Sequence, residues 1–121
     1  MTELITALFL LVGGSFTLLA AVGSLRMPDL FTRMQAATKG STLGVGCLLA
    51  AVAVYFGELG VVTRALAGVA FILLTAPVAA HMIGRAAYFI SVPLWHGTIV
   101  DELRGRYEPD THRLSSLSKD E

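Results

Sequence analysis

The sequence predicts an all-α integral membrane protein with three transmembrane helices, and three observations support this fold class. Of the 121 residues, 55% are hydrophobic and only 15% are charged, whereas a soluble domain of this size covers its core with charge. The Asp, Glu, Lys and Arg residues gather between and after three long uncharged stretches, which are residues 4–25, 40–57 and 65–84. Because about 20 helical residues cross a hydrocarbon core about 30 Å thick, each stretch is long enough to span a bilayer.

The first stretch is expected to be a retained helix with the N-terminus outside the cell. The chain opens with Met1, Thr2 and Glu3, which places an acid where a secretory signal needs basic residues. The apolar run that follows is also longer than the hydrophobic region of a signal. All three stretches are expected to be helical despite their glycines, because the backbone in lipid must satisfy its own hydrogen bonds.

Residues 26–39, between the first two stretches, predict a short amphipathic helix on the inner membrane surface. Pro28 suits the first turn of a helix, and Asp29 suits its positive end. Apolar side chains share one face of this segment, and Arg26, Asp29 and Arg33 share another. A solvated turn with helix caps is the alternative interpretation. In either case Thr38 or Ser41 is expected to cap the second span.

The distribution of basic residues predicts how the chain is oriented. All Lys and Arg residues except Arg64 fall on one side of a three-span arrangement. The positive-inside rule then places residues 26–39 and the C-terminal tail in the cytoplasm. Residues 1–97 form the predicted membrane domain. Residues 98–121 form a polar tail that is expected to be partly disordered, because it is too short and too polar to build its own core.

Each predicted span also carries small residues at helical spacing. The main helix-packing candidates are Gly13, Thr17, Gly46, Ala50, Ala76, Ala80 and Gly84. Small residues let helix backbones approach closely, and such packing drives association in lipid. Two interpretations stay open: the three stripes face one another within the chain, or some of them face helices of other chains. Three thin spans around no obvious cavity favour the second.

No Asp, Glu, Lys or Arg lies within the three stretches. Proton and sodium carriers normally keep an ionisable group in the membrane, so this chain by itself lacks the parts of a proton relay. The sequence also shows no nucleophile–base pair, no phosphate-binding loop and no metal-ligand spacing, so neither an enzyme nor a cofactor is expected. Cys47 is interpreted as a small packing residue. The formal net charge of zero gives no case for nucleic acid as a partner.

The end of the third stretch holds the main candidate site. Pro77, His81 and Arg85 are spaced four residues apart and fall on nearly one helix face. They either anchor the helix at the membrane interface or contact an ion path or a partner subunit, for which Asp29, Arg33 and Thr75 are further candidates. The hydroxyls of Thr6, Ser15, Thr17 and Thr75 either line part of a sodium route or bond back to their own helices.

Two strings carry a resemblance to a known family. Residues 23–39 followed by Thr42-Leu43-Gly44, and residues 75–88, resemble the signatures of the G subunit of Mrp-type (Mnh/Pha) monovalent cation/proton antiporters. With the three spans, the match covers residues 1 to about 90. Gln35 departs from the pattern, because the family commonly has histidine there.

The resemblance implies a small subunit of a multi-protein complex in the bacterial plasma membrane. Such a complex exchanges cytoplasmic sodium for external protons and supports pH and salt homeostasis, and its large subunits hold the charged proton path. The expected partners are the other subunits of the antiporter complex, the lipid bilayer, and the transported sodium and protons. The expected role is chiefly packing, with lining of the cation path as a competing role. The alternative hypothesis is a self-assembling small transporter or channel.

Overall fold

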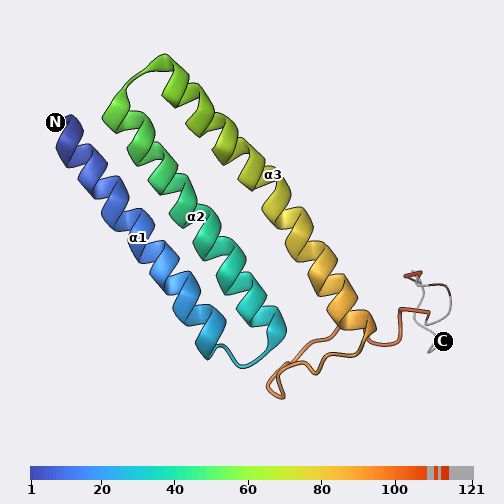
Figure 1. Cartoon of the computed structure of the whole chain (residues 1–121). Helices are drawn as coiled ribbons and strands as arrows, with labels where there is room; N and C mark the ends of the chain where they lie inside the picture. The colour runs from blue at the N-terminus through green and yellow to red at the C-terminus, as the bar shows by residue number, and fades with distance from the viewer. Residues whose placement is uncertain (109–110, 112, 115–121) are drawn as a thin grey trace.

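The computed structural model describes residues 1–108, 111, 113 and 114, and its regular structure in that part of the chain is three long helices. Helix α1 runs Thr2–Arg26, α2 runs Leu30–Phe56 and α3 runs Leu59–Phe89. Each is long and apolar enough to cross a membrane, which confirms the predicted three-span, all-α fold. The N-terminus and the α2–α3 turn lie at one end, and the α1–α2 turn and the end of α3 lie at the other (Figure 1).

The segment 26–39 differs from its predicted form. Only residues 27–29 separate α1 from α2, and residues 30–39 continue directly into the second span instead of forming a separate helix. Asp29 is the N-cap of α2, with an extended backbone (φ −130°, ψ 164°). The predicted cap at Thr38 or Ser41 is wrong, because both residues lie inside α2 and their hydroxyls donate to the carbonyls of Met34 and Ala37. A continuous helix keeps the backbone hydrogen bonds internal, whereas a break near residue 40 would expose backbone groups close to lipid.

The α2–α3 turn is as short as the first one. Gly57 ends α2 in the left-handed conformation, with φ of 63°, which a glycine adopts without steric cost. Glu58 then precedes α3 as its N-cap. Because both turns are short, consecutive helices must run antiparallel, so α1 and α3 point in the same direction.

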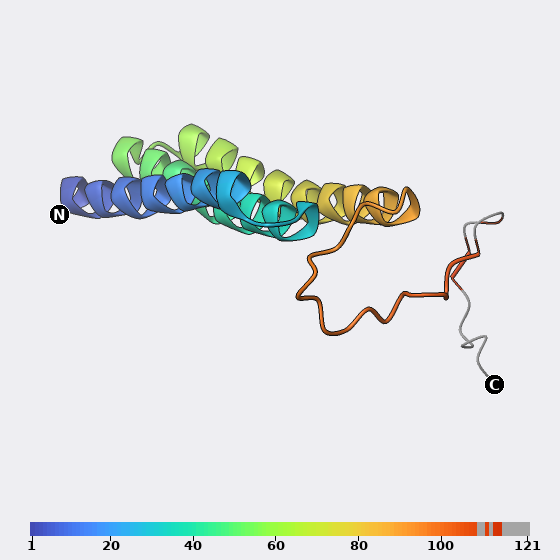
Figure 2. The ribbon, with the colours of Figure 1, turned by 90° about the horizontal axis from the view of Figure 1, so that it is seen from below.

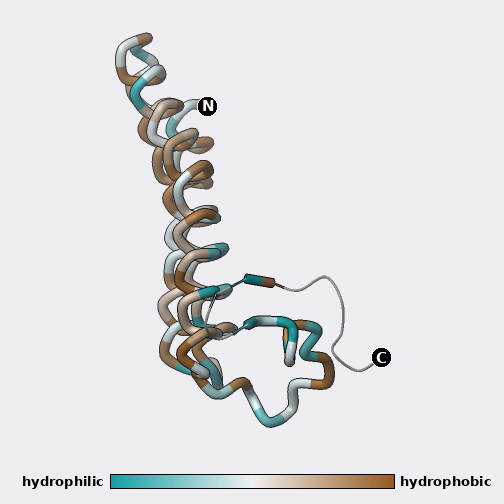
Figure 3. Tube along the Cα trace, turned by 90° about the vertical axis from the view of Figure 1, so that its right-hand side faces the viewer, coloured by the Kyte–Doolittle hydropathy of each residue, from teal (hydrophilic) through white to brown (hydrophobic). Residues whose placement is uncertain are grey.

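The helices form a single layer with α2 in the middle, and Figure 1 shows this order. α1 packs on α2 and α2 packs on α3, while α1 and α3 do not contact each other. Figure 2 shows the layer from below, and in Figure 3 it is seen nearly edge-on, where the helices overlap in a narrow column. Among the described residues, the buried apolar side chains are all alanines: Ala20, Ala51, Ala65 and Ala87.

Close backbone contact holds α1 against α2. A Cβ atom added to Gly13 would lie 2.9 Å from the carbonyl oxygen of Gly44, and one added to Gly40 would lie 2.7 Å from the Cβ of Ala20. A Cβ on Gly44 would collide with the hydroxyl of Thr17. Glycines at these positions therefore set the distance between the two helices, as small residues do in membrane helix packing.

The described part of the tail folds back onto the end of α3. The hydroxyl of Tyr88 donates a hydrogen bond to the Asp101 carboxylate at 3.0 Å. The ring of Tyr107 packs against Phe89, with 4.6 Å between ring centroids. The predicted disorder of residues 98–121 falls partly on residues 109–110, 112 and 115–121, which lie outside the described residues.

Candidate functional site

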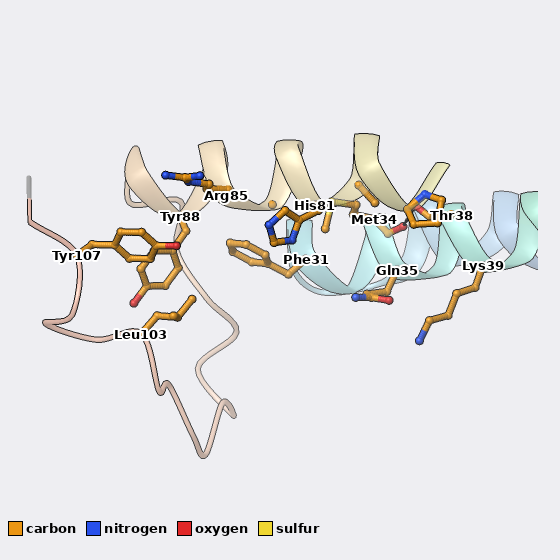
Figure 4. Close-up of a pocket in the computed structure, with 13 residues that line it drawn as sticks. Phe31, Met34, Gln35, Thr38, Lys39, His81, Arg85, Tyr88, Leu103 and Tyr107 are labelled. Atoms are coloured by element: carbon orange, nitrogen blue, oxygen red, sulfur yellow. Dashed lines mark hydrogen bonds between the residues drawn. The ribbon is translucent and has the colours of Figure 1, made fainter. Parts of the chain in front are cut away.

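A groove of about 540 Å³ opens between α2, α3 and the tail, at the end of the layer where α2 begins and α3 ends. Figure 4 shows its residues as sticks. Its lining comprises Phe31, Met34, Gln35, Thr38 and Lys39 from α2, Pro77, Ala80, His81, Gly84, Arg85 and Tyr88 from α3, and Leu103 and Tyr107 from the tail. The groove therefore combines aromatic and apolar walls with three basic side chains, and no carboxylate belongs to its lining within the described residues.

The α3 side of the groove contains the predicted face of Pro77, His81 and Arg85. His81 is exposed and lies beside Phe31 of α2 (Figure 4). Arg85 instead extends toward the end of α3, where its Cζ atom lies 5.4 Å from the centroid of the Phe89 ring, a distance typical of a cation–π contact. The three residues thus share the groove, but His81 and Arg85 point to different parts of it (Figure 4).

Asp29, Arg33 and Thr75 are not among the groove residues. Asp29 accepts a hydrogen bond from the hydroxyl of Thr32, and Arg33 donates from Nε to the carbonyl of Met27 at 2.7 Å. These bonds fix the short α1–α2 turn. The hydroxyl of Thr75 donates to the carbonyl of Phe71 at 2.7 Å, within its own helix.

The hydroxyl groups considered for a sodium route do not gather in one place. Ser15 and Thr17 donate to carbonyls one turn back in α1, at 2.7 and 2.9 Å. Thr6 is buried, and its Oγ1 atom has no hydrogen-bond partner among the described residues. Thr75 lies on α3, which does not contact α1. The four oxygens therefore cannot surround one cation within this chain.

Five of the seven small residues separate into two groups. Gly13 and Thr17 lie where α1 meets α2. Gly46 lines a second cavity, of about 210 Å³, between α2 and α3, and a Cβ added there would meet no atom within 4 Å. Ala80 and Gly84 line the larger groove, and a Cβ on Gly84 would lie 3.1 Å from the Cε of Met34. Ala50 and Ala76 are half-buried.

Sequence reasoning missed the α2 and tail sides of the groove. Thr38 and Lys39 follow Gln35 and Phe31 at helical spacing, a signal that is visible only if residues 30–39 are read as one helix with the second span. Leu103 and Tyr107 reach the groove because the tail turns back, and no local pattern indicates that. No group of three His, Cys, Asp or Glu side chains within the described residues is placed to hold a metal ion.

Comparison with known proteins connects this arrangement to one family. The chain matches the PhaG_MnhG_YufB family, described as a Na+/H+ antiporter subunit, over residues 9–88. It is 43% identical over 110 residues to the G subunit of the Na(+)/H(+) antiporter of Alkalihalophilus pseudofirmus, a match that covers 88% of this chain and 91% of that protein.

Two solved assemblies contain a similar chain. One is the membrane-bound sulfane sulfur reductase, an archaeal respiratory membrane complex, with a TM-score of 0.76 and 42% identity over 84% of this chain and 94% of the other. The second is the Mrp complex from Dietzia sp. DQ12-45-1b, with a TM-score of 0.78 and 21% identity over 84% and 91% of the two chains, which shows a shared fold. From the matched length and the identity to the Alkalihalophilus protein, this chain belongs to the PhaG/MnhG/YufB family of Na+/H+ antiporter subunits.

Proposed function

We propose that the chain is the G-type subunit of a multisubunit sodium(monovalent cation)/proton antiporter in the plasma membrane, where it packs against larger subunits and carries no catalytic reaction or proton relay of its own. The observation that carries this proposal is the single layer of helices. Large apolar side chains remain exposed on every helix, for example Leu11 at 70%, Leu43 at 52% and Leu74 at 74%. Lipid or neighbouring helices must cover such side chains, and a layer three helices wide encloses no path.

Scaffolding is favoured over lining of the cation path. The four hydroxyls that were candidates for a sodium route sit on α1 and α3, which do not contact each other. The stretches 4–25, 40–57 and 65–84 also hold no Asp, Glu, Lys or Arg. A cation crossing the membrane must exchange its water for fixed charges or dipoles. We infer that the larger subunits supply them.

The similarity to a chain of a respiratory complex supports the same role. A chain 42% identical to this one belongs to a membrane-bound sulfane sulfur reductase, while a protein 43% identical is an antiporter subunit. A packing role could serve in both complexes, whose overall reactions differ. We therefore infer that this chain acts as a packing module beside larger membrane subunits.

The proposed orientation places the N-terminus and the α2–α3 turn outside the cell. Both lie at one end of the layer, and the α1–α2 turn and tail lie at the opposite end (Figure 1). Arg64 is the basic residue near the outer end, and the remaining Lys and Arg residues belong to the other side in sequence.

The proposal is tested by sodium-dependent proton flux in reconstituted vesicles. The chain alone is expected to give no flux, and flux is expected to appear when the chain is reconstituted with the proteins that co-purify with it in mild detergent. Those proteins are expected to differ from it in size. Sodium-dependent flux from the chain alone, together with a crosslinked ladder of identical chains, would instead establish a self-assembling transporter.

A further inference from the structure

Between α2 and α3, the groove described above is followed deeper in the layer by a second, apolar cavity. The second cavity, of about 210 Å³, is lined by α2 residues that include Gly46 and by α3 residues that include Val69 and Leu73. On α3, the residues that line the groove and the second cavity, from Arg85 back to Val69, occupy consecutive turns of the helix.

On α2 the lining residues also occupy consecutive turns of the helix. Gln35, Lys39, Thr42 and Gly46 succeed one another every three or four residues, and they line first the large groove and then the small cavity. The hydroxyl of Thr42 donates a hydrogen bond to the carbonyl of Thr38 at 2.6 Å, so this hydrogen bond is made within α2 and not to a group in the cavity. The two cavities therefore occupy successive turns of the same α2–α3 interface, which we call the cleft, and this cleft is polar and basic at one end and apolar at the other.

Among the described residues, the charged side chains that line the wide end are all basic. Lys39, His81 and Arg85 line it, and no carboxylate of the described part of the chain does. The Asp101 carboxylate is held nearby by the hydroxyl of Tyr88 and by the amide of Leu103, and it is not among the lining residues. A wall of this kind is complementary to an anion, and Lys39 and Arg85 stand at the ends of the uncharged stretches, where lipid headgroups are found.

The length of the cleft matches a lipid chain. From His81 back to Val69, α3 rises by about 18 Å at roughly 1.5 Å per residue. One leaflet of a hydrocarbon core about 30 Å thick measures about 15 Å. The cleft between the levels of His81 and Val69 is therefore about as long as one leaflet is deep. Gly46 leaves the apolar end open, because a Cβ added there would meet no atom within 4 Å.

We propose that this cleft is a binding site for one anionic phospholipid, with its phosphate near Lys39 and His81 and one acyl chain lying along Gly46 and Val69. Leu103 and Tyr107 of the tail close the groove on its outer side. A free anion would use only the basic end, and an acidic side chain of a partner protein would leave the apolar part empty. A phospholipid fits both parts of the cleft at once, and this site does not depend on whether the complex carries out antiport.

The test is native mass spectrometry of the full-length chain titrated with phosphatidylglycerol or with phosphatidylcholine. One phosphatidylglycerol is expected to bind per chain more tightly than phosphatidylcholine. Lys39→Gln is expected to weaken phosphatidylglycerol binding about fivefold, the usual effect of one basic residue at a membrane surface. The control Arg64→Gln, at the opposite end of the layer, is expected to leave it unchanged.

A second pair of variants tests the apolar part of the cleft. Gly46→Leu fills it without touching a charge and is expected to weaken phosphatidylglycerol binding, whereas Gly14→Leu, also in open space, is expected to have no effect. Loss with Lys39→Gln but not with Gly46→Leu would mean an anion site without a lipid. Equal binding by all four variants would overturn the proposal. So would a photoreactive group at Gln35 that, in the assembled complex, crosslinks to a neighbouring protein and not to lipid.

Discussion

At the scale of single residues, the same residue type has opposite roles in this chain. Gly44 faces α1 across a contact so close that a Cβ would press on Thr17 and lie 3.0 Å from the carbonyl oxygen of Gly13. Gly46, two positions later, faces open space. Both belong to the glycine-rich start of the second stretch, and composition does not distinguish them. What separates them is the rotation of about 200° that two residues make around a helix with 3.6 residues per turn.

This difference predicts a matched pair of mutational effects. Gly44→Ala is expected to lower the free energy of unfolding by about 1–3 kcal/mol, because the added methyl forces α1 and α2 apart. Gly46→Ala is expected to change the free energy of unfolding by less than about 0.5 kcal/mol. Denaturation of the purified chain in mixed detergent micelles measures both. Equal losses of stability for the two variants would contradict the close α1–α2 contact.

At the scale of elements, α2 and α3 each extend beyond the uncharged stretch that spans the membrane. α2 begins ten residues before the uncharged stretch 40–57, and α3 ends five residues after the stretch 65–84. These extensions bring Phe31, Gln35 and Lys39 opposite His81 and Arg85. A helix continues past its apolar stretch because its backbone hydrogen bonds remain satisfied and residues 30–39 contain no glycine or proline.

The end of α3 also holds the tail, which predicts a change in protease sensitivity. Tyr88→Phe removes the hydrogen bonds to the half-buried Asp101 carboxylate at 3.0 and 3.2 Å. A bond to a charged group in partial contact with water contributes about 1 kcal/mol. We therefore expect trypsin to cleave after Arg104 and Arg106 about fivefold faster in the variant, as followed by gel analysis of inside-out vesicles.

A control separates this contact from general loosening of the tail. Thr111→Val removes a hydrogen bond within the tail, from the Thr111 hydroxyl to Glu108 at 3.0 Å, and leaves the contact with α3 intact. It is expected to be cleaved at the rate of the unmodified chain. If the two variants are cleaved at the same rate, the Tyr88–Asp101 contact does not hold the tail.

At the scale of the whole molecule, the chain is one layer thick and incomplete without its surroundings. α2 is covered by α1 on one side and by α3 on the other, while both broad faces of the layer remain open (Figures 1 and 3). A soluble protein with this burial would not be stable, because apolar area removed from water is the main driving force of folding. In lipid the same faces need no burial, and they are available to larger subunits.

The orientation of the layer gives a further prediction. In a Cys47→Ser background, Glu58→Cys in the α2–α3 turn is expected to react with a membrane-impermeant maleimide in intact cells. Asp29→Cys in the α1–α2 turn is expected to react only after the cells are permeabilised, because the positive-inside rule predicts that the end rich in basic residues lies in the cytoplasm. The reverse labelling pattern would place the N-terminus inside.

The sequence by itself determined the number of helices, the apolar stretch within each helix, the family and one wall of the groove. The uncharged stretches define the spans because a charged side chain in hydrocarbon is costly, and the four-residue spacing of Pro77, His81 and Arg85 places them on one face. Only the tertiary structure decided that the helices form a row, that Gly13 and Gly44 meet while Gly46 stays open, and that Lys39 and Tyr107 complete the groove. The physical reason is that a helix surrounded by lipid is apolar on all sides, so hydrophobicity does not distinguish the face that packs on a neighbouring helix. That face is decided by close packing between particular small residues.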